Sequence, residues 1–118
     1  MIQKGDLRFG DIVWTEFDPS VGHEYQDKRP AIVIQSNEQL NRSNLVTIIP
    51  LTSRSSNIVG DDILIPADQE NKLRIDSVAK VYNITSFDYS RFLKIIGKIN
   101  AKSIFKIKNY LKKHFGII

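Results

Sequence analysis

The first two thirds of the chain alternate short apolar runs with polar turns. Three runs rich in β-branched residues lie at 11–17, 31–35 and 45–51. Runs of this length and composition suit strands in the core of a sheet better than helices. Two more candidate strands lie in "DDILIP" (61–66) and "DSVAKVYNITSF" (76–87). Five short strands joined by loops rich in Ser, Asn and Gly predict a small barrel or a strongly bent sheet.

The pattern changes to a helical period after Asn100. This residue is suited to cap a helix, and Gly116 is suited to end it. Between them one narrow apolar stripe is predicted, formed by Ile104, Ile107, Leu111 and Phe115. Lysines fall on the opposite side, at Lys102, Lys106 and Lys113. The sequence therefore predicts one α+β domain over residues 1–118, mainly β, with a C-terminal helix packed on the sheet.

The composition excludes several kinds of site. The chain has no cysteine, which rules out disulfides and thiolate metal ligands and fits a reducing cytoplasm. Its two histidines, His23 and His114, leave a zinc site short of ligands. We therefore expect no metal and no other cofactor. No apolar run approaches the roughly 20 residues that cross a membrane, and no signal-peptide pattern precedes the first strand. These features predict a cytoplasmic protein with no membrane partner.

The charges are distributed unevenly. Residues 1–88 carry nine basic and thirteen acidic side chains, whereas residues 89–118 carry eight basic side chains and no acidic one. A segment of one sign attracts a polyanion, either a nucleic acid or an acidic protein segment. The alternative is a lysine-rich helix face that only contacts water. The asymmetry by itself identifies no partner.

A set of short motifs between residues 10 and 53 gives the sequence a family resemblance. In order, the chain reads G-D-I at the first strand, D-P before a loop, G-H-E after it, R-P-A at the next strand, and P-L-T-S at the end of the third. This order and spacing resemble the MazF/PemK/Kid family of bacterial toxins, and a weaker match continues to the terminal helix. The resemblance implies an SH3-like barrel, a homodimer and metal-independent, sequence-specific cleavage of single-stranded RNA. It also implies a cognate antitoxin with a flexible acidic tail.

The chemistry that such a nuclease needs can be assigned to residues. RNA carries its own nucleophile, the ribose 2′-hydroxyl, so the protein has to align it, move protons and stabilise charge on the phosphate. The guanidinium of Arg29 can hold phosphate oxygens through two hydrogen bonds, and Pro30 biases its backbone toward an extended form. The family resemblance assigns catalytic roles to Arg29 and Thr52. On the residues alone, a surface ion pair and a backbone-bonded threonine remain open alternatives.

Further residues follow from the same reasoning. His23 is expected to handle protons because imidazole titrates near neutral pH, with Glu24 beside it. An exposed loop histidine is the alternative. Ser53 is expected to bind phosphate or RNA. Three more expected RNA-binding residues lie further along the chain: Lys80, Tyr82 and Asn83.

The chain departs from the family at "YNIT", residues 82–85, where many members have an acid, a glutamine and then an arginine. Tyr82 is expected to stack on a base, or else to be an ordinary strand aromatic. The departures leave three other functions open. The first is a non-enzymatic toxin of the same fold that binds a protein target such as gyrase, as CcdB does. The second is a catalytically impaired relative that binds RNA or an antitoxin, and the third is a general nucleic-acid-binding barrel.

Overall fold

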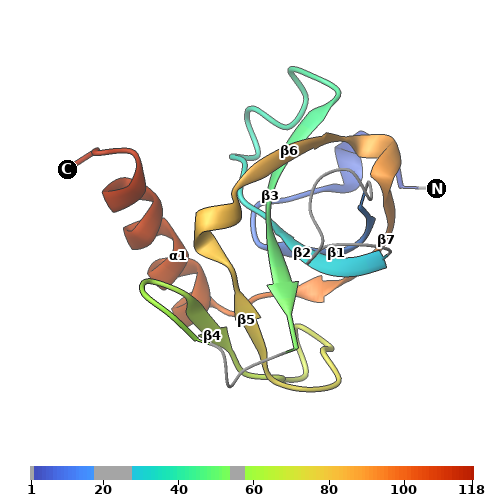
Figure 1. Ribbon diagram of the computed structural model, residues 1–118. Coiled ribbons are helices and arrows are strands. Elements are labelled where there is room, and N and C mark those ends of the chain that lie inside the picture. The colour runs from blue at the N-terminus through green and yellow to red at the C-terminus, as the bar shows by residue number, and fades with distance from the viewer. Residues whose placement is uncertain (1, 18–27, 54–57) are drawn as a thin grey trace.

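The computed structural model describes residues 2–17, 28–53 and 58–118. Figure 1 shows strands that curl around one another, with a single α-helix to one side. In chain order the elements are η1 (Lys4–Asp6), β1 (Asp11–Glu16), β2 (Lys28–Val33), β3 (Leu45–Thr52), β4 (Ile63–Ile65), β5 (Ser77–Ala79), η5 (Val81–Asn83), β6 (Thr85–Asp88), η6 (Tyr89–Arg91), β7 (Phe92–Lys98) and α1 (Ala101–His114). The predicted mainly β fold with a C-terminal helix is confirmed.

All strand pairs in the sheet are antiparallel, in the order β4-β5-β3-β2-β1-β7. Strand β3 is the centre of the sheet, because its first half also pairs with β6 and its last residues pair with β5. Within the described residues β4 and β7 do not pair, so the sheet is strongly bent rather than closed into a barrel. A backbone hydrogen bond of 3.1 Å from Lys98 N–H to the carbonyl of Glu70 links β7 to the loop that follows β4.

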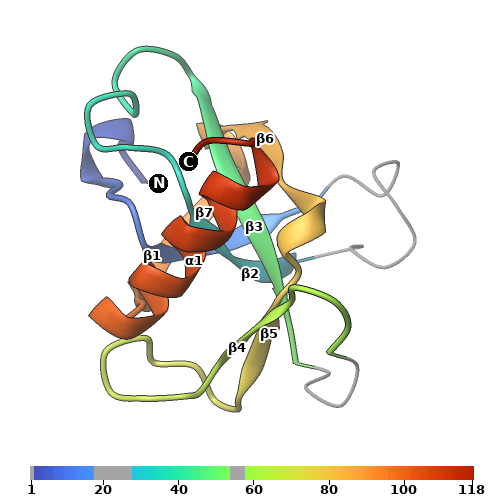
Figure 2. The ribbon, with the colours of Figure 1, turned by 90° about the vertical axis from the view of Figure 1, so that its left-hand side faces the viewer.

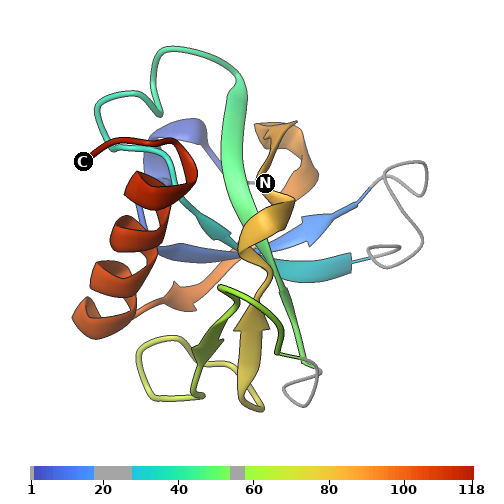
Figure 3. The same ribbon diagram turned by 60° about the vertical axis from the view of Figure 1, so that its left-hand side comes forward.

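The structure corrects the predicted strands in two places. The segment 76–87 is not one strand: η5 divides it into β5 and β6, and this turn lets the chain move from one half of β3 to the other (Figure 3). Strand β7 was not predicted. It is an edge strand with exposed lysines and half-buried apolar residues, so its sequence lacks the continuous apolar run of a central strand.

Both faces of the sheet are buried, which explains why the strands lack clean alternation. Neighbouring residues such as Ile12 and Val13 belong to two different core clusters, on opposite faces of β1. One cluster includes Ile107 and Tyr110 and therefore lies under α1, and the other contains Phe17, Phe87 and Phe92. Figure 2 shows α1 crossing in front of the sheet.

The helix begins as predicted, because the Asn100 side chain accepts a 2.9 Å hydrogen bond from Ser103 N–H. Gly116, with φ of +68°, follows its end as expected for a left-handed stop. The predicted packing stripe is wrong at its last member: Phe115 is 60% exposed, because the chain has already left the helix there. Ser103 and Tyr110 are buried instead.

No helix in the described residues is long and apolar enough to cross a membrane.

Candidate functional site

A cavity of about 910 Å³ opens beside β1, β2 and β7. We call it the cationic cavity. Its described lining residues come from five parts of the chain: β1, the start of β2, the end of β3 with Ser53, the loop that leads into β5 together with Ser77 of β5, and β7. They are Trp14, Lys28, Arg29, Pro30, Leu51, Ser53, Lys72, Leu73, Arg74, Ile75, Ser77, Lys94 and Ile96.

The charge of the described part of this lining has one sign. Among the described residues, five lining side chains are basic (Lys28, Arg29, Lys72, Arg74 and Lys94), and none is acidic. Within the described part of the chain, none of the five forms an ion pair with a carboxylate. Unpaired cations around a partly apolar hollow focus a positive potential, which raises the local concentration of a polyanion. The cavity is therefore suited to bind a phosphate-bearing ligand.

Arg29 lies at the edge of this cavity, on β2. Its backbone is opposite Thr15 of β1, and Pro30 follows it in the strand. The Nε atom of Arg29 is buried and has no hydrogen-bond partner in the described structure. A buried donor without a partner is destabilising, and an anionic acceptor would relieve that cost. The Nε–H of Arg29 is therefore a donor that an anionic group in the cavity could satisfy.

The two predicted hydroxyl residues are adjacent in sequence but differ in their surroundings. Thr52 is the last residue of β3, lies opposite Val78 of β5 and is only 9% exposed. It does not line the cavity, whereas Ser53, one residue further, does. The structure thus brings Arg29 and Ser53 to one cavity, and Thr52, the neighbour of Ser53 in sequence, is not part of its lining.

Five basic or aromatic lining residues were missed by the sequence analysis: Trp14, Lys28, Lys72, Arg74 and Lys94. Trp14 lies between Pro30 and Lys94 in the strand register, which puts an aromatic side chain beside a basic one. Lys72 and Arg74 reach the same cavity from the loop before β5. The spacing of Lys72 and Arg74, two residues apart, could have indicated a basic surface in the sequence. Only the fold of the loop shows that both line the same cavity as Arg29.

Three predicted RNA-binding residues lie elsewhere. Lys80, Tyr82 and Asn83 belong to the segment around η5, and none of them lines the cationic cavity. Lys80 forms a 2.8 Å ion pair with the buried carboxylate of Asp62. Tyr82 occupies a 3₁₀ turn rather than a strand and is 57% exposed. Their assignment to RNA binding stays a prediction.

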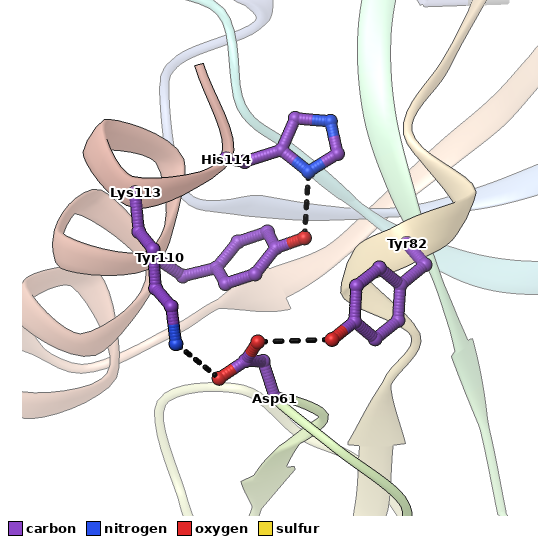
Figure 4. Close-up of polar contacts among 5 residues, drawn as sticks. All are labelled: Asp61, Tyr82, Tyr110, Lys113 and His114. Carbon is purple, nitrogen blue, oxygen red and sulfur yellow. Dashed lines mark hydrogen bonds and ion pairs between the residues drawn. The ribbon is translucent and has the colours of Figure 1, made fainter. Parts of the chain in front are cut away.

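Tyr82 takes part in a polar cluster with α1 (Figure 4). Its hydroxyl donates a 2.9 Å hydrogen bond to Asp61, whose other oxygen accepts a 3.0 Å bond from Lys113. The bonds from Lys113 and Tyr82 hold the pKa of Asp61 below its ordinary value. The bond to Asp61 in turn raises the pKa of Tyr82. Lys113 was expected to lie opposite the apolar stripe of α1 and to attract an acidic partner. Its side chain is 70% exposed, but its ammonium already binds Asp61.

His23 and Glu24 lie outside the described residues, so the predicted proton-transfer groups have no structural description. Among the residues that are described, no three His, Asp or Glu side chains gather in a way that could hold a metal ion.

The fold and the cavity define a small, mainly β protein with a hollow whose described lining carries five basic side chains. The chain belongs to the family of PemK-like, MazF-like toxins of type II toxin-antitoxin systems, whose family model matches residues 8–115.

Individual relatives agree with this family. Endoribonuclease MazF9 of Mycobacterium tuberculosis is 28% identical over 117 residues, which cover 94% of this chain and 98% of that protein. The crystal structure of MazF (Form-I) from Deinococcus radiodurans superposes with a TM-score of 0.77 at 25% identity, covering 93% of this chain and 96% of the other. A mycobacterial endoribonuclease solved in complex with its cognate antitoxin shares the fold, with a TM-score of 0.69 at 14% identity over 95% of each chain.

Proposed function

We propose that this protein is the toxin of a type II toxin-antitoxin pair and an endoribonuclease that cuts single-stranded RNA at short specific sequences. The family membership supports the toxin and nuclease assignment. The observation that carries the proposal is the unpaired Arg29 Nε in a cavity whose described lining has five cations and no acid. Such a lining fits the phosphodiester backbone, which dominates the affinity of proteins for nucleic acids.

The proposed reaction uses the 2′-hydroxyl next to the scissile phosphate. Its oxygen attacks phosphorus, the bond to the 5′-oxygen of the next nucleotide breaks, and the products are a 2′,3′-cyclic phosphate and a 5′-hydroxyl. Arg29 holds the non-bridging oxygens and stabilises the charge that grows on them in the transition state. Its planar guanidinium suits this task because two parallel N–H groups match two phosphate oxygens.

The remaining roles are assigned as follows. His23 accepts and returns protons, with Glu24 nearby. Ser53 donates a hydrogen bond to the phosphate from the cavity wall, and Thr52 takes the catalytic role that the family resemblance implies. Trp14 offers a face on which a base can stack, next to the cationic Lys94. The protein acts as a homodimer in the cytoplasm without a metal ion.

An antitoxin with an acidic, flexible tail is the proposed protein partner. The toxin-antitoxin family supports the existence of a partner. The charge of the C-terminal segment supports an acidic partner. Residues 89–118 include eight basic side chains and no acidic one, and five of the eight are lysines of α1. Lys102 and Lys106 are exposed on this helix.

The decisive experiment is cleavage of a long single-stranded RNA by the purified protein, with and without EDTA. We expect cutting to continue in EDTA and to leave cyclic phosphate and 5′-hydroxyl ends on end-group analysis. An oligonucleotide carrying a single 2′-deoxy nucleotide at the mapped cut site should resist. Loss of activity in EDTA would contradict the metal-free mechanism. Inhibition of gyrase acting on supercoiled DNA, with RNA left intact, would instead support a protein-binding toxin.

A further inference from the structure

The loop between β4 and β5 forms one wall of the cationic cavity. Four consecutive residues of this loop, 72–75, line the cavity, and we call them the cationic arm. The arm contributes Lys72 and Arg74, two of the five basic side chains. Both are exposed, and neither forms an ion pair with a described carboxylate. The arm is separated by more than forty residues from Arg29 in sequence, yet it faces the same hollow.

A buried asparagine fixes the backbone of the arm. Asn71 is 1% exposed, and its side-chain oxygen accepts hydrogen bonds of 3.0 Å from both Asp68 N–H and Leu73 N–H. Its side-chain nitrogen donates a 2.8 Å bond to the carbonyl of Pro66. One amide side chain therefore holds the loop on both sides of the turn, and it carries no charge of its own.

The same turn holds Lys72 in an unfavourable backbone conformation. Its φ is +56°, in the left-handed region that non-glycine residues rarely adopt. Its N–H donates a 3.1 Å bond to the carbonyl of Asp68. Unfavourable backbone conformations persist where the surrounding bonds impose them, and they are concentrated at functional sites.

Two contacts fix the position of the cationic arm relative to the rest of the fold. Asp68 accepts a 3.1 Å bond from the side chain of Asn100, the residue that caps α1. The loop also lies very close to β7 at Gly97. A Cβ atom added to Gly97 would lie 2.5 Å from the carbonyl oxygen of Glu70 and 2.6 Å from that of Asn71. Only a residue without a side chain allows this approach, so Gly97 determines how close the arm lies to Lys94 and Ile96 of β7.

From these contacts we propose that Lys72 and Arg74 form a second phosphate subsite, distinct from that of Arg29, and that Asn71 and Gly97 are its positioning residues. The subsite binds a backbone phosphate of single-stranded RNA that is not the one being cut. The chemical class of this ligand rests on the proposed function. The subsite gives affinity and register along the strand, while Arg29 acts on the reacting phosphate.

The test is binding of a short, fluorescein-labelled, fully 2′-O-methylated single-stranded RNA, measured by anisotropy at several salt concentrations. This probe lacks the nucleophile, so binding is read without cleavage. The variant Lys72→Gln/Arg74→Gln is expected to lower the slope of log K against log salt by about 0.7, the contribution of one neutralised phosphate of a single strand. The matched control, Lys102→Gln/Lys106→Gln, removes the same charge from exposed positions of α1 and should leave the slope unchanged.

The positioning residues are tested without removing a charge. Asn71→Ala should lower the salt slope although it is a neutral substitution, a result that a general loss of packing would not give. If Asn71→Ala does not fold, Gly97→Ala provides the same test, with Gly5→Ala as its control because an added Cβ there meets nothing within 4 Å. A slope unchanged in the arm variants, or lowered equally by the α1 control, would overturn the subsite.

The two proposals fail in different ways. A protein that binds the methylated probe through the arm but cuts no RNA would leave the subsite standing and contradict the nuclease assignment. A protein that cuts RNA while its arm variants bind the probe and cleave like the wild type would contradict the subsite and leave the nuclease assignment intact.

Discussion

The hydroxyl of Tyr82 donates a 2.9 Å hydrogen bond to Asp61, and this contact ties η5 to the loop before β4. The same carboxylate binds Lys113 of α1 at 3.0 Å, so three separate segments meet at one side chain (Figure 4). Tyr110 adds an edge-to-face ring contact with Tyr82 at 6.0 Å between centroids. Tyr82 is therefore held in place by its hydroxyl and by one edge of its ring, although much of its surface remains exposed.

This contact predicts how Tyr82 titrates. The bond to Asp61 raises the pKa of Tyr82, because losing the proton would place two negative charges side by side. In Asp61→Asn the phenol should therefore ionise at a lower pH than in the wild type. Ultraviolet difference spectra through the alkaline range measure this shift. Tyr82→Phe identifies which part of the signal belongs to Tyr82, and a titration unaffected by Asp61→Asn would show that the bond does not persist in solution.

Asp61 should also make stability depend on pH. Its folded pKa is depressed, so its contribution is present above the unfolded value of about 3.9 and is lost as the pH falls through the folded value. Asp61→Asn should thus lower the free energy of unfolding at pH 7 and change it little at pH 2. Urea unfolding at both pH values measures the difference. An equal change at the two pH values would indicate a loss of packing rather than of charge.

Arg29 is expected to be the residue most sensitive to substitution. Arg29→Ala should lower kcat/KM by roughly 10²-fold or more, the scale for removing a donor to a transition state. Arg29→Lys should not restore it, because an ammonium lacks the two parallel donors of a guanidinium. Single-turnover cleavage of RNA gives the measurement, with circular dichroism as the check on folding. Full activity of a folded Arg29→Ala protein would contradict the assignment.

The family resemblance favours Thr52 as the catalytic hydroxyl residue, whereas its neighbour Ser53 is the one that lines the cavity. If Thr52 contributes a catalytic group, Thr52→Ala should lower kcat by about 10²-fold. If Ser53 supplies the bond to phosphate, Ser53→Ala should have the larger effect, because Ser53 lines the cavity and Thr52 does not. Thr52→Ser, which keeps the hydroxyl and removes a methyl group, distinguishes lost chemistry from lost packing. Parallel kinetics of the three variants decide between the two residues.

Association with an acidic antitoxin tail should slow as salt rises, since charge steering acts mainly on the association rate. Reversing Lys102 and Lys106 to Glu is expected to slow association further and to leave the dissociation rate nearly unchanged. Lys113 is left intact in this test, because its reversal would also repel Asp61. Stopped-flow or surface-based kinetics provide the rates. Association rates insensitive to both salt and charge would mean that these lysines only contact water.

The predictable part of the fold is the part that depends on local sequence. The runs 31–35 and 45–51 gave β2 and β3 because β-branched residues buried on both faces leave a continuous apolar pattern. Asn100 and Gly116 marked the ends of α1 because capping involves only neighbouring backbone groups. Strand β7 was not predicted because an edge strand tolerates lysines that a central strand excludes. Phe115 was misassigned because helical spacing does not show where the chain leaves the helix.

The candidate site likewise has a part that local sequence predicts and a part that only the tertiary structure shows. The local order of motifs around Arg29, Pro30 and Ser53 was sufficient to single these residues out, since they lie at the ends of strands whose positions the sequence predicts. The partnership of Arg29 with Lys72, Arg74 and Lys94 was decided only by tertiary structure, because it depends on the bend of the sheet and on the loop that Asn71 fixes against Gly97. The binding of Lys80 and Lys113 by Asp62 and Asp61 was likewise invisible in sequence, because a charge can be paired by residues far away along the chain.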